Sequence, residues 1–321
     1  MSQYGHSTTG AEIMRRFSSY ADGKTILVTG PSPSTLGSET AITLAKHSHP
    51  AHLLLLGRSA SKLEPVVESI RTVNSTVKVT IIPCELSSLA SVRSAAVLIS
   101  STLAAANAKL DIIINNAGIM AVSPYRATGD GFESQFAVNH LSHFLLTNLL
   151  YADLAQGVRV VNLTSNGHEI GPIRWDDYNF GEGREYDPWL AYGQSKSANI
   201  LFSKAISRKM AKKQAKSIAV HPGMVLGTSL CANSNVSKEL LDQGIELATQ
   251  NAGGELPPAS LKNLEQGCST TLVAALDPDM EDGAYLTDCN ITEPKPWAKD
   301  DENVFKLWEL SERLVGEKFE F

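Results

Sequence analysis

The amino-acid sequence predicts an α/β fold in which helices cover both faces of a parallel sheet. Short apolar runs alternate along the chain with longer segments of helical spacing. The runs are continuously apolar, as in 24–29 and 110–115, which is typical of strands buried on both faces. No Pro/Gly/Ser-rich linker, internal repeat or change of composition divides the 321 residues. We therefore expect one domain, residues 1–321, built as a Rossmann-like doubly wound sheet of about seven parallel strands.

Strands and helices are expected to take turns along most of the chain. The expected strands lie at 24–29, 53–56, 77–83, 110–115, 157–164, 216–221 and 283–287. A helix is expected after each early strand, beginning with the Ala/Thr-rich segment from Leu36 to His47. The terminal arms 1–22 and 290–321 are interpreted as appendages to this single unit.

Two long irregular stretches, 166–190 and 229–260, interrupt this alternation. Long excursions at the ligand end of such a sheet usually form the substrate pocket or its lid, and plain surface loops are the alternative. The first stretch is rich in aromatic residues: Trp175, Tyr178, Phe180 and Trp189. These residues favour an apolar or aromatic substrate, unless they only fix the loop to the body of the protein.

Composition excludes several classes of function. The chain has 28 Lys and Arg against 34 Asp and Glu, a net charge of −6, so nucleic acid is not expected as the main partner. The cysteines are scattered without a C-x-x-C pair, which predicts neither a zinc site nor a disulfide framework: Cys84, Cys231, Cys268 and Cys289. No metal is expected.

Because no apolar stretch resembles a secretory signal or a membrane span, we expect a cytoplasmic protein.

The loop after the first strand is a candidate phosphate-binding turn. Its small residues would let backbone N–H groups and the following helix N-terminus approach a phosphate. The candidate residues are Gly30, Ser32, Ser34, Thr35, Leu36 and Gly37. An ordinary turn is the alternative by spacing alone, but the first βα turn is where dinucleotide pyrophosphates bind in doubly wound folds.

The end of the second strand indicates which dinucleotide is bound. Arg58 and Ser59 follow this strand, and no Asp or Glu lies between residues 50 and 57. An acid there would bind the ribose 2′-hydroxyl of NAD, whereas an arginine suits the 2′-phosphate of NADP. The two residues therefore favour NADP(H), the alternative being a solvated arginine and a helix N-cap serine.

Tyr192 and Lys196 lie four residues apart in a segment of helical spacing, so both side chains project from one face. A phenol with a pKa near ~10 transfers protons poorly at neutral pH unless a nearby cation stabilises its phenolate, which Lys196 would do. Ser165 follows a strand and could hydrogen-bond a substrate oxygen, or be a turn serine. His140 and His143 lie on the expected helix of Asn139 and are interpreted as packing residues.

Taken together, these motifs resemble the short-chain dehydrogenase/reductase superfamily. They occur in its order and approximate spacing: Thr29-Gly30…Gly37, Asn115-Asn116-Ala117-Gly118, Asn139, Ser165, Tyr192-x-x-x-Lys196 and His221-Pro222-Gly223. The strings RVVNLTS, YGQSKSANILF, VHPGMVLGT and GAYLTDC are similar to the branch containing retinol dehydrogenases and WW-domain oxidoreductases, particularly soluble fungal members. The resemblance covers about residues 22–290.

The resemblance implies hydride transfer between a nicotinamide and a carbonyl or carbinol carbon. Tyr192 would be the general acid in reduction and the base in oxidation, and Ser165 would polarise the substrate oxygen. Lys196 would bind the nicotinamide ribose and lower the pKa of Tyr192. Asn139 would hold a water that links Lys196 to solvent. The family also implies a homodimer or homotetramer through the Tyr192 helix.

The same resemblance assigns the cofactor cleft. It places Glu85, Leu86, Asn116, Ala117 and Gly118 on the adenosine side, and Pro222, Gly223, Val225 and Thr228 beside the nicotinamide. Three positions depart from the family pattern: Ser34 or Thr35 stands where the loop has its middle glycine, Glu85 replaces Asp, and one extra residue precedes Thr228.

The sequence thus predicts an NADP(H)-dependent oxidoreductase that reduces a ketone, or oxidises a secondary alcohol, of a small apolar or aromatic substrate. The alternative is a non-redox use of the same scaffold, either as a cofactor-sensing regulator or as a template for another reaction such as a cyclisation. The altered phosphate loop keeps this alternative open, whereas the presence of Ser165, Tyr192 and Lys196 favours the enzyme.

Overall fold

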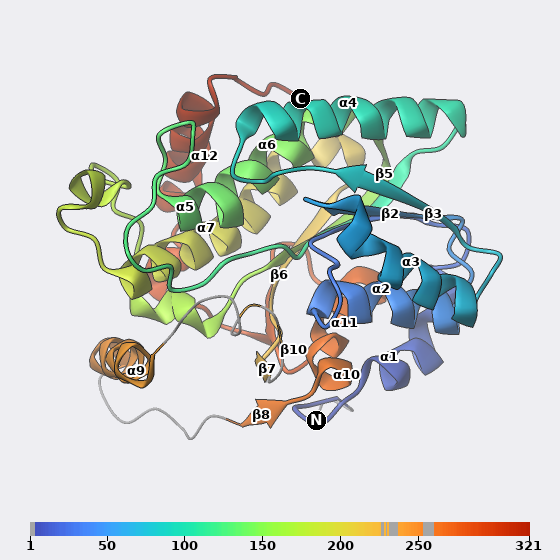
Figure 1. Ribbon diagram of the computed structural model, residues 1–321, viewed down its shortest axis with the longest axis horizontal. Helices are drawn as coiled ribbons and strands as arrows, with labels where there is room; N and C mark the ends of the chain where they lie inside the picture. Colours follow the sequence, from blue (N-terminus) through green and yellow to red (C-terminus); the bar gives the residue numbers. More distant parts are fainter. Residues whose placement is uncertain (1–3, 226–227, 229, 231–236, 253–259) are drawn as a thin grey trace.

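The computed structural model describes residues 4–225, 228, 230, 237–252 and 260–321 (Figure 1). Its centre is an eight-stranded sheet with the strand order β10-β9-β6-β5-β4-β1-β2-β3. The strands are β1 (Thr25–Thr29), β2 (His52–Gly57), β3 (Lys78–Pro83), β4 (Leu110–Asn115), β5 (Leu154–Leu163), β6 (Lys216–His221), β9 (Tyr285–Thr287) and β10 (Asn290–Thr292). The chain extends the sheet outward from β1 through β2 and β3, then in the opposite direction from β4, so the strand order reverses between β1 and β4.

Helices connect the strands and cover the sheet. The α-helices are α1 (Gly10–Phe17), α2 (Leu36–His47), α3 (Ala60–Val73), α4 (Leu89–Ala105), α5 (Ser134–Phe136), α6 (Ser142–Leu149), α7 (Pro188–Lys209), α9 (Lys238–Ala252), α10 (Leu264–Gly267), α11 (Ser269–Leu276) and α12 (Asp301–Val315). A π-turn, η2 (Ala137–Leu141), joins α5 to α6. The 3₁₀ turns are η1 (Ser18–Tyr20), η3 (Tyr151–Asp153), η4 (Asn166–Ile170), η5 (Phe180–Gly183), η6 (Ala211–Lys213) and η7 (Pro296–Ala298). In the described parts of the chain, no helix combines the length and apolar character needed to cross a membrane.

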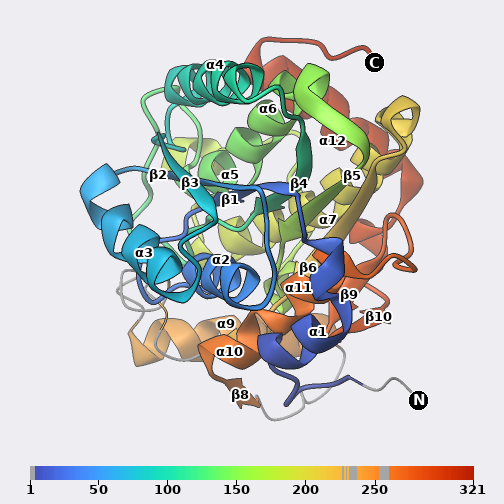
Figure 2. The same cartoon turned by 90° about the vertical axis from the view of Figure 1, so that its right-hand side faces the viewer.

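The core consists of two apolar layers, one on each face of the sheet (Figure 2). Successive strand residues point to opposite faces. In β1, Leu27 packs into the layer under α4, α6, α7 and α12, while Ile26 and Val28 pack into the layer under α1, α2, α3 and α11. Helices cover both apolar layers, so the strands are buried on both faces, which explains why they are continuously apolar in sequence.

The seven predicted strands are confirmed, and the main sheet contains one further strand. All seven expected strands are parallel to their neighbours, from β2 beside β3 to β9 beside β6. The eighth strand, β10, is antiparallel to β9 and lies in the segment expected to be a terminal arm. Asp288 and Cys289 form the tight turn between them with φ of 49° and 65°. Because neither residue is a glycine or asparagine, this turn carried no sequence signal.

The terminal segments are parts of the core, contrary to their interpretation as appendages. Ile13, Met14 and Phe17 of α1 are buried beneath α11 and α2. Leu307 and Trp308 of α12 are buried against α7 and α6. Both helices are amphipathic, and each buries its apolar stripe on a sheet-covering helix.

Most of helix α7 is enclosed within the chain. All residues from 191 to 203 are buried, and α5, α12 and η4 pack against the helix. Its carboxyl end is exposed at Arg208 and Lys209. The expected homodimer or homotetramer through this helix stays a prediction.

The two irregular stretches lie near the start of α7. The first stretch, 166–190, contains η4 and η5 and runs into the start of α7. Asp187 caps this helix, because its carboxylate accepts hydrogen bonds from the backbone N–H groups of Trp189 and Leu190, both at 2.8 Å. The second, 229–260, contains α9, which packs against η4. Its residues 229, 231–236 and 253–259, like the N-terminal residues 1–3, lie outside the described residues. A separate two-stranded sheet pairs β7 (Met224–Val225) with β8 (Leu261–Lys262).

Candidate functional site

Most candidate residues lie at or near the carboxyl ends of the parallel strands β1 to β6, on both sides of the point where the strand order reverses. Ligands bind at this point in open α/β sheets, because the loops on either side diverge and leave a crevice.

The loops after β1 and β4 are joined by hydrogen bonds. The Thr29 hydroxyl accepts from the backbone N–H groups of Asn116 at 2.9 Å and Ala117 at 3.0 Å. The Asn116 side chain donates to the Thr29 carbonyl at 2.8 Å. Gly30 has φ of 67°, and a β-carbon there would lie 2.8 Å from the Ala117 β-carbon, so only glycine fits. Gly37, at the start of α2, lies against the Asn116 amide.

The altered phosphate loop is ordered by Thr35. The hydroxyl of Thr35 donates to the Ser32 carbonyl at 2.7 Å and caps α2 by accepting from the Ser38 N–H at 3.2 Å. Ser34 has φ of 59°, the left-handed conformation that glycine adopts most easily. Ser34 therefore takes the conformational place of the missing glycine, and the turn still leads into a helix N-terminus that suits an anion.

Arg58 and Glu85 lie side by side where β2 and β3 end. The Arg58 guanidinium is 4.0 Å from the Glu85 carboxylate, and both side chains are exposed. The Glu85 carboxylate also accepts from the Ser87 N–H at 3.2 Å. Ser59 precedes α3 but its hydroxyl bonds to Ser61 rather than to the helix backbone. Leu86 is buried in the core.

Tyr192 and Lys196 share one face of α7, as predicted. The Lys196 Nζ lies 5.5 Å from the centroid of the Tyr192 ring and donates to the Leu163 carbonyl at 3.3 Å. Burial lowers the pKa of Lys196 to about 8. Much of this amine therefore remains charged at neutral pH, beside a phenol that is 4 % exposed.

Ser165 and Tyr192 meet across Gly167. The Gly167 N–H donates to the Ser165 Oγ at 3.0 Å. A β-carbon on Gly167 would lie 2.6 Å from Cε1 of Tyr192 and 3.3 Å from the Ser165 Oγ. The ring thus packs closely against the backbone at Gly167. No pattern predicted Gly167, whose only signal is its place two residues after the candidate serine.

Asn139 lies at the centre of the π-turn and ties two segments together. Its side chain accepts from the Ile119 N–H at 2.8 Å and donates both to the Ile119 carbonyl and to the Ser195 hydroxyl at 2.9 Å. A β-carbon on Gly118 would lie 3.1 Å from the Asn139 Oδ1 and 3.5 Å from the Lys196 Nζ. Asn139, Gly118 and Lys196 are therefore neighbours, and π-turns frequently mark functional sites.

The His221-Pro222-Gly223 turn lies against an ion pair between Lys262 and Asp288. The aliphatic part of the Lys262 side chain packs against Gly223, and the Lys262 ammonium pairs with the Asp288 carboxylate at 2.6 Å. The lysine side chain is fully buried. Val225 pairs with Lys262 in the β7–β8 sheet, and Thr228 is buried. No pattern predicted Lys262, because it is isolated in sequence.

An apolar cluster adjoins Tyr192. It contains Ala121, Ile170, Trp189 and Tyr192, bordered by Met120, Leu190 and by Leu240, Leu247 and Ala248 of α9. The Trp189 ring meets the Tyr192 ring edge-on at 6.1 Å, and its indole N–H donates to the Leu240 carbonyl. By contrast, Trp175 and Tyr178 pack on the main core and Phe180 is fully buried. Among Trp175, Tyr178, Phe180 and Trp189, Trp189 is the one beside the candidate site.

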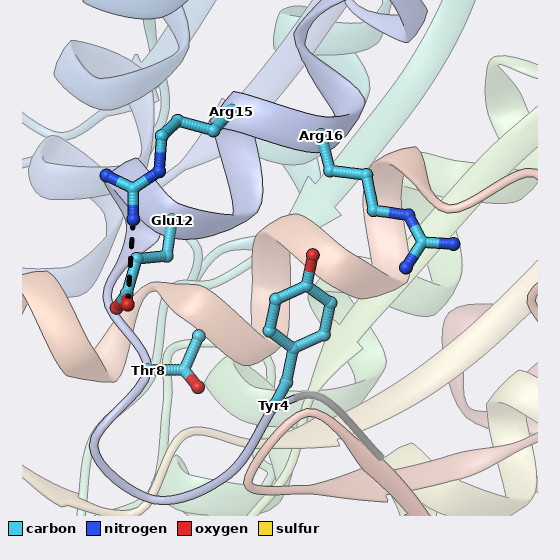
Figure 3. Close-up of a pocket in the computed structure, with 5 residues that line it drawn as sticks. All are labelled: Tyr4, Thr8, Glu12, Arg15 and Arg16. Carbon is cyan, nitrogen blue, oxygen red and sulfur yellow. Dashed lines mark ion pairs between the residues drawn. The ribbon is translucent and has the colours of Figure 1, made fainter.

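Two hollows of the surface lie apart from these residues. One, of about 410 Å³, is lined by Tyr4, Thr8, Glu12, Arg15 and Arg16 (Figure 3). In it Arg15 pairs with Glu12 at 3.6 Å. The other lies along 176–184. Within the described ranges, no group of three or more His, Cys, Asp or Glu residues could hold a metal ion.

Comparisons with known proteins show similarity to short-chain dehydrogenases along nearly the whole chain. The family model of the short chain dehydrogenases matches residues 24–180. The chloroplastic short-chain dehydrogenase TIC 32 A of Brassica napus is 35% identical over 328 residues, which cover 98% of this chain and 95% of that protein. Retinol dehydrogenase 12 of Mus musculus is 35% identical over 93% of this chain and 88% of its own. The WW domain-containing oxidoreductase of Danio rerio is 34% identical, covering 92% of this chain and 69% of that protein.

Solved structures show the same fold. A crystal structure of an uncharacterised protein from Mycobacterium paratuberculosis is 32% identical, covers 96% of this chain and 98% of that chain, and has a TM-score of 0.72. A short-chain dehydrogenase/reductase from Serratia marcescens is 20% identical with a TM-score of 0.60, covering 83% of this chain and 96% of that chain.

Proposed function

Because the chain belongs to the short-chain dehydrogenase/reductase superfamily, in the branch of the retinol dehydrogenases and WW domain oxidoreductases, we propose that it is an NADP(H)-dependent oxidoreductase. It reduces a ketone, or oxidises a secondary alcohol, of a small apolar or aromatic substrate. The observation that carries this proposal is the meeting of Ser165, Tyr192 and Lys196 next to an apolar cluster.

The cofactor would bind along the crevice between the loops after β1 and β4. The turn from Gly30 to Gly37 would hold the pyrophosphate, since its backbone approaches closely and opens a helix N-terminus. Asn116 to Gly118 would border the adenosine side. Pro222, Gly223 and Thr228 would border the nicotinamide. When bound, the nicotinamide supplies the hydride in reduction and accepts it in oxidation.

Tyr192 transfers the proton. In reduction its hydroxyl donates to the substrate oxygen, and the ammonium of Lys196 stabilises the phenolate that remains. In oxidation the phenolate takes the proton of the carbinol. Lys196 can serve in this way because the Leu163 carbonyl that holds its ammonium is neutral and leaves the positive charge available to the phenolate.

Ser165 positions the substrate oxygen. Its Oγ accepts from the Gly167 N–H and donates to the Asn166 side chain at 3.2 Å. Because Asn166 is exposed, a substrate oxygen can replace it as the acceptor of the serine proton. Serine and tyrosine then donate to the same oxygen, where negative charge develops in reduction.

Arg58 supports the choice of NADP(H). Its guanidinium lies 4.0 Å from the Glu85 carboxylate, in an exposed position where such ion pairs contribute little. The 2′-phosphate carries more charge and accepts bidentate hydrogen bonds from a guanidinium. We further propose that the chain acts as a single domain in the cytoplasm.

The proposal is tested by titrating the purified protein with NADPH and NADH and following nicotinamide fluorescence at fixed ionic strength. We expect preferential binding of NADPH, followed by turnover of apolar ketones in a substrate screen. A folded protein that binds neither nucleotide would refute the redox function and favour a non-redox use of the scaffold.

A further inference from the structure

Two buried histidines lie one turn apart after Asn139, and they face different parts of the molecule. His140 bonds to the Ser311 hydroxyl of α12 at 2.7 Å, among the rings of Phe136, Phe144 and Phe202. His143 instead faces the candidate site. Its Nε2 lies 2.9 Å from the Thr29 hydroxyl and its Nδ1 lies 3.1 Å from the Asn139 carbonyl. Both histidines are buried, so burial alone does not explain why His143 bonds to Thr29 and Asn139.

The partners of His143 determine its tautomer. The Thr29 hydroxyl already accepts two backbone N–H groups, those of Asn116 and Ala117, so its own proton points to His143 Nε2. The proton of the ring is therefore on Nδ1, which donates to the Asn139 carbonyl. Burial, with a smaller contribution from the charge of Lys196, lowers the pKa of His143 to about 4. The ring is neutral at physiological pH and keeps this tautomer.

The bond to Asn139 supports an unusual backbone. In the π-turn the Ser142 N–H bonds five residues back to the Ala137 carbonyl. The side chains at the end of the turn then donate to the next two carbonyls: Ser142 Oγ to Val138 at 2.7 Å, and His143 to Asn139. The widened turn directs the Asn139 side chain to Ile119 and Ser195, which flank Gly118 and Lys196.

We propose that His143 is a positioning residue that couples the loop after β1, on the cofactor side, to the Asn139 turn beside Lys196. The inference deepens the proposed function and rests on it. His143 touches no reacting atom. Its Nε2 fixes the Thr29 hydroxyl that orders Asn116 and Ala117, and its Nδ1 fixes the carbonyl of Asn139.

The two halves of this coupling can be separated by substitution. The amide of asparagine can take the place of Nδ1, and that of glutamine the place of Nε2, whereas leucine supplies neither group. His143→Asn should therefore keep the bond to Asn139, and His143→Gln the bond to Thr29. His140→Leu is the matched control, because it removes an equally buried histidine of the same helix that faces α12.

Three readouts distinguish positioning from packing. In His143→Leu we expect turnover to fall by about tenfold or more, and the pH midpoint of alcohol oxidation to rise by about half a unit or more, because Lys196 stabilises the Tyr192 phenolate less well. NADPH affinity should fall by about fivefold or more. His143→Asn should restore the pH midpoint and His143→Gln the NADPH affinity. The third readout needs no cofactor: hydrogen exchange at the Ile119 N–H should accelerate in His143→Leu.

His140→Leu should lower the melting temperature about as much as His143→Leu while leaving the pH midpoint, NADPH affinity and Ile119 exchange as in the wild type. If His143→Leu behaves like this control in an active enzyme, the inference is wrong and the proposed function stands. If the wild type binds no nucleotide, the proposed function fails. Unchanged Ile119 exchange in His143→Leu would then overturn the coupling as well.

Discussion

Gly167→Ala is the substitution for which the structure gives the sharpest expectation. A β-carbon at this position would lie 2.6 Å from Cε1 and 2.8 Å from Cδ1 of Tyr192. Unbonded carbon atoms rest at about 3.5–4.0 Å, so the ring must retreat by about 1 Å. The glycine backbone is held by its hydrogen bond to Ser165, and Tyr192 is buried in the amino-terminal part of α7, so neither side yields easily.

A displacement of about 1 Å at a catalytic group lowers kcat/KM by about 10²-fold, and we expect a loss of that order in Gly167→Ala. The free energy of unfolding should fall by about 1–3 kcal/mol from the overpacking. NADPH affinity should change by less than about threefold, because Gly167 is not among the residues that we propose to hold the cofactor. The assay combines steady-state kinetics with nicotinamide fluorescence and thermal unfolding.

Gly171→Ala is the control, since a β-carbon there would meet Leu190 at 3.4 Å, an ordinary contact, and its φ of −176° suits any residue. This variant should keep nearly all of its activity. A Gly167→Ala enzyme with kcat/KM within about threefold of the wild type would show that the Tyr192 position is not critical, and would refute the reasoning.

Three further substitutions test other parts of the account. Arg58→Gln should lower the preference for NADPH over NADH by about tenfold or more in fluorescence titrations, and an unchanged preference would exclude Arg58 as the 2′-phosphate ligand. Trp189→Ala should lower the KM of bulky ketones relative to small ones, because the indole fills the space between Tyr192 and α9; equal changes for both would place the pocket elsewhere. Burial raises the pKa of Glu133 to about 7, so the wild type should lose stability as the pH rises from about 4.5 to about 7. Glu133→Gln should flatten this part of the curve in denaturant unfolding measured at several pH values, and an unaltered slope would assign the dependence to other groups.

The sequence predicted the sheet well because continuous apolar strands carry a strong local signal. All seven expected strands formed, and Ser165, Tyr192 and Lys196 came together as their positions after β5 and on α7 implied. The edge strand β10 escaped prediction because it is short and its turn uses Asp288 and Cys289 in the left-handed region.

Residues whose role depends on contacts between distant segments could not be predicted. His143 looked like a packing histidine, and only the fold brings it to Thr29 across 114 positions of sequence. Lys262 meets Gly223 and Asp288 through a β-pairing that no pattern marks. Trp189 is one of five aromatic residues in 166–190, and tertiary packing decides which of them adjoins Tyr192.

The central claim is that Tyr192 is the proton donor and acceptor of a redox reaction. Tyr192→Phe removes only the hydroxyl and retains the ring that packs against Gly167 and Trp189. We expect turnover of the ketone to fall by about 10²-fold or more while the NADPH dissociation constant stays within about threefold of the wild-type value. A Tyr192→Phe enzyme that turns over at the wild-type rate would contradict the claim.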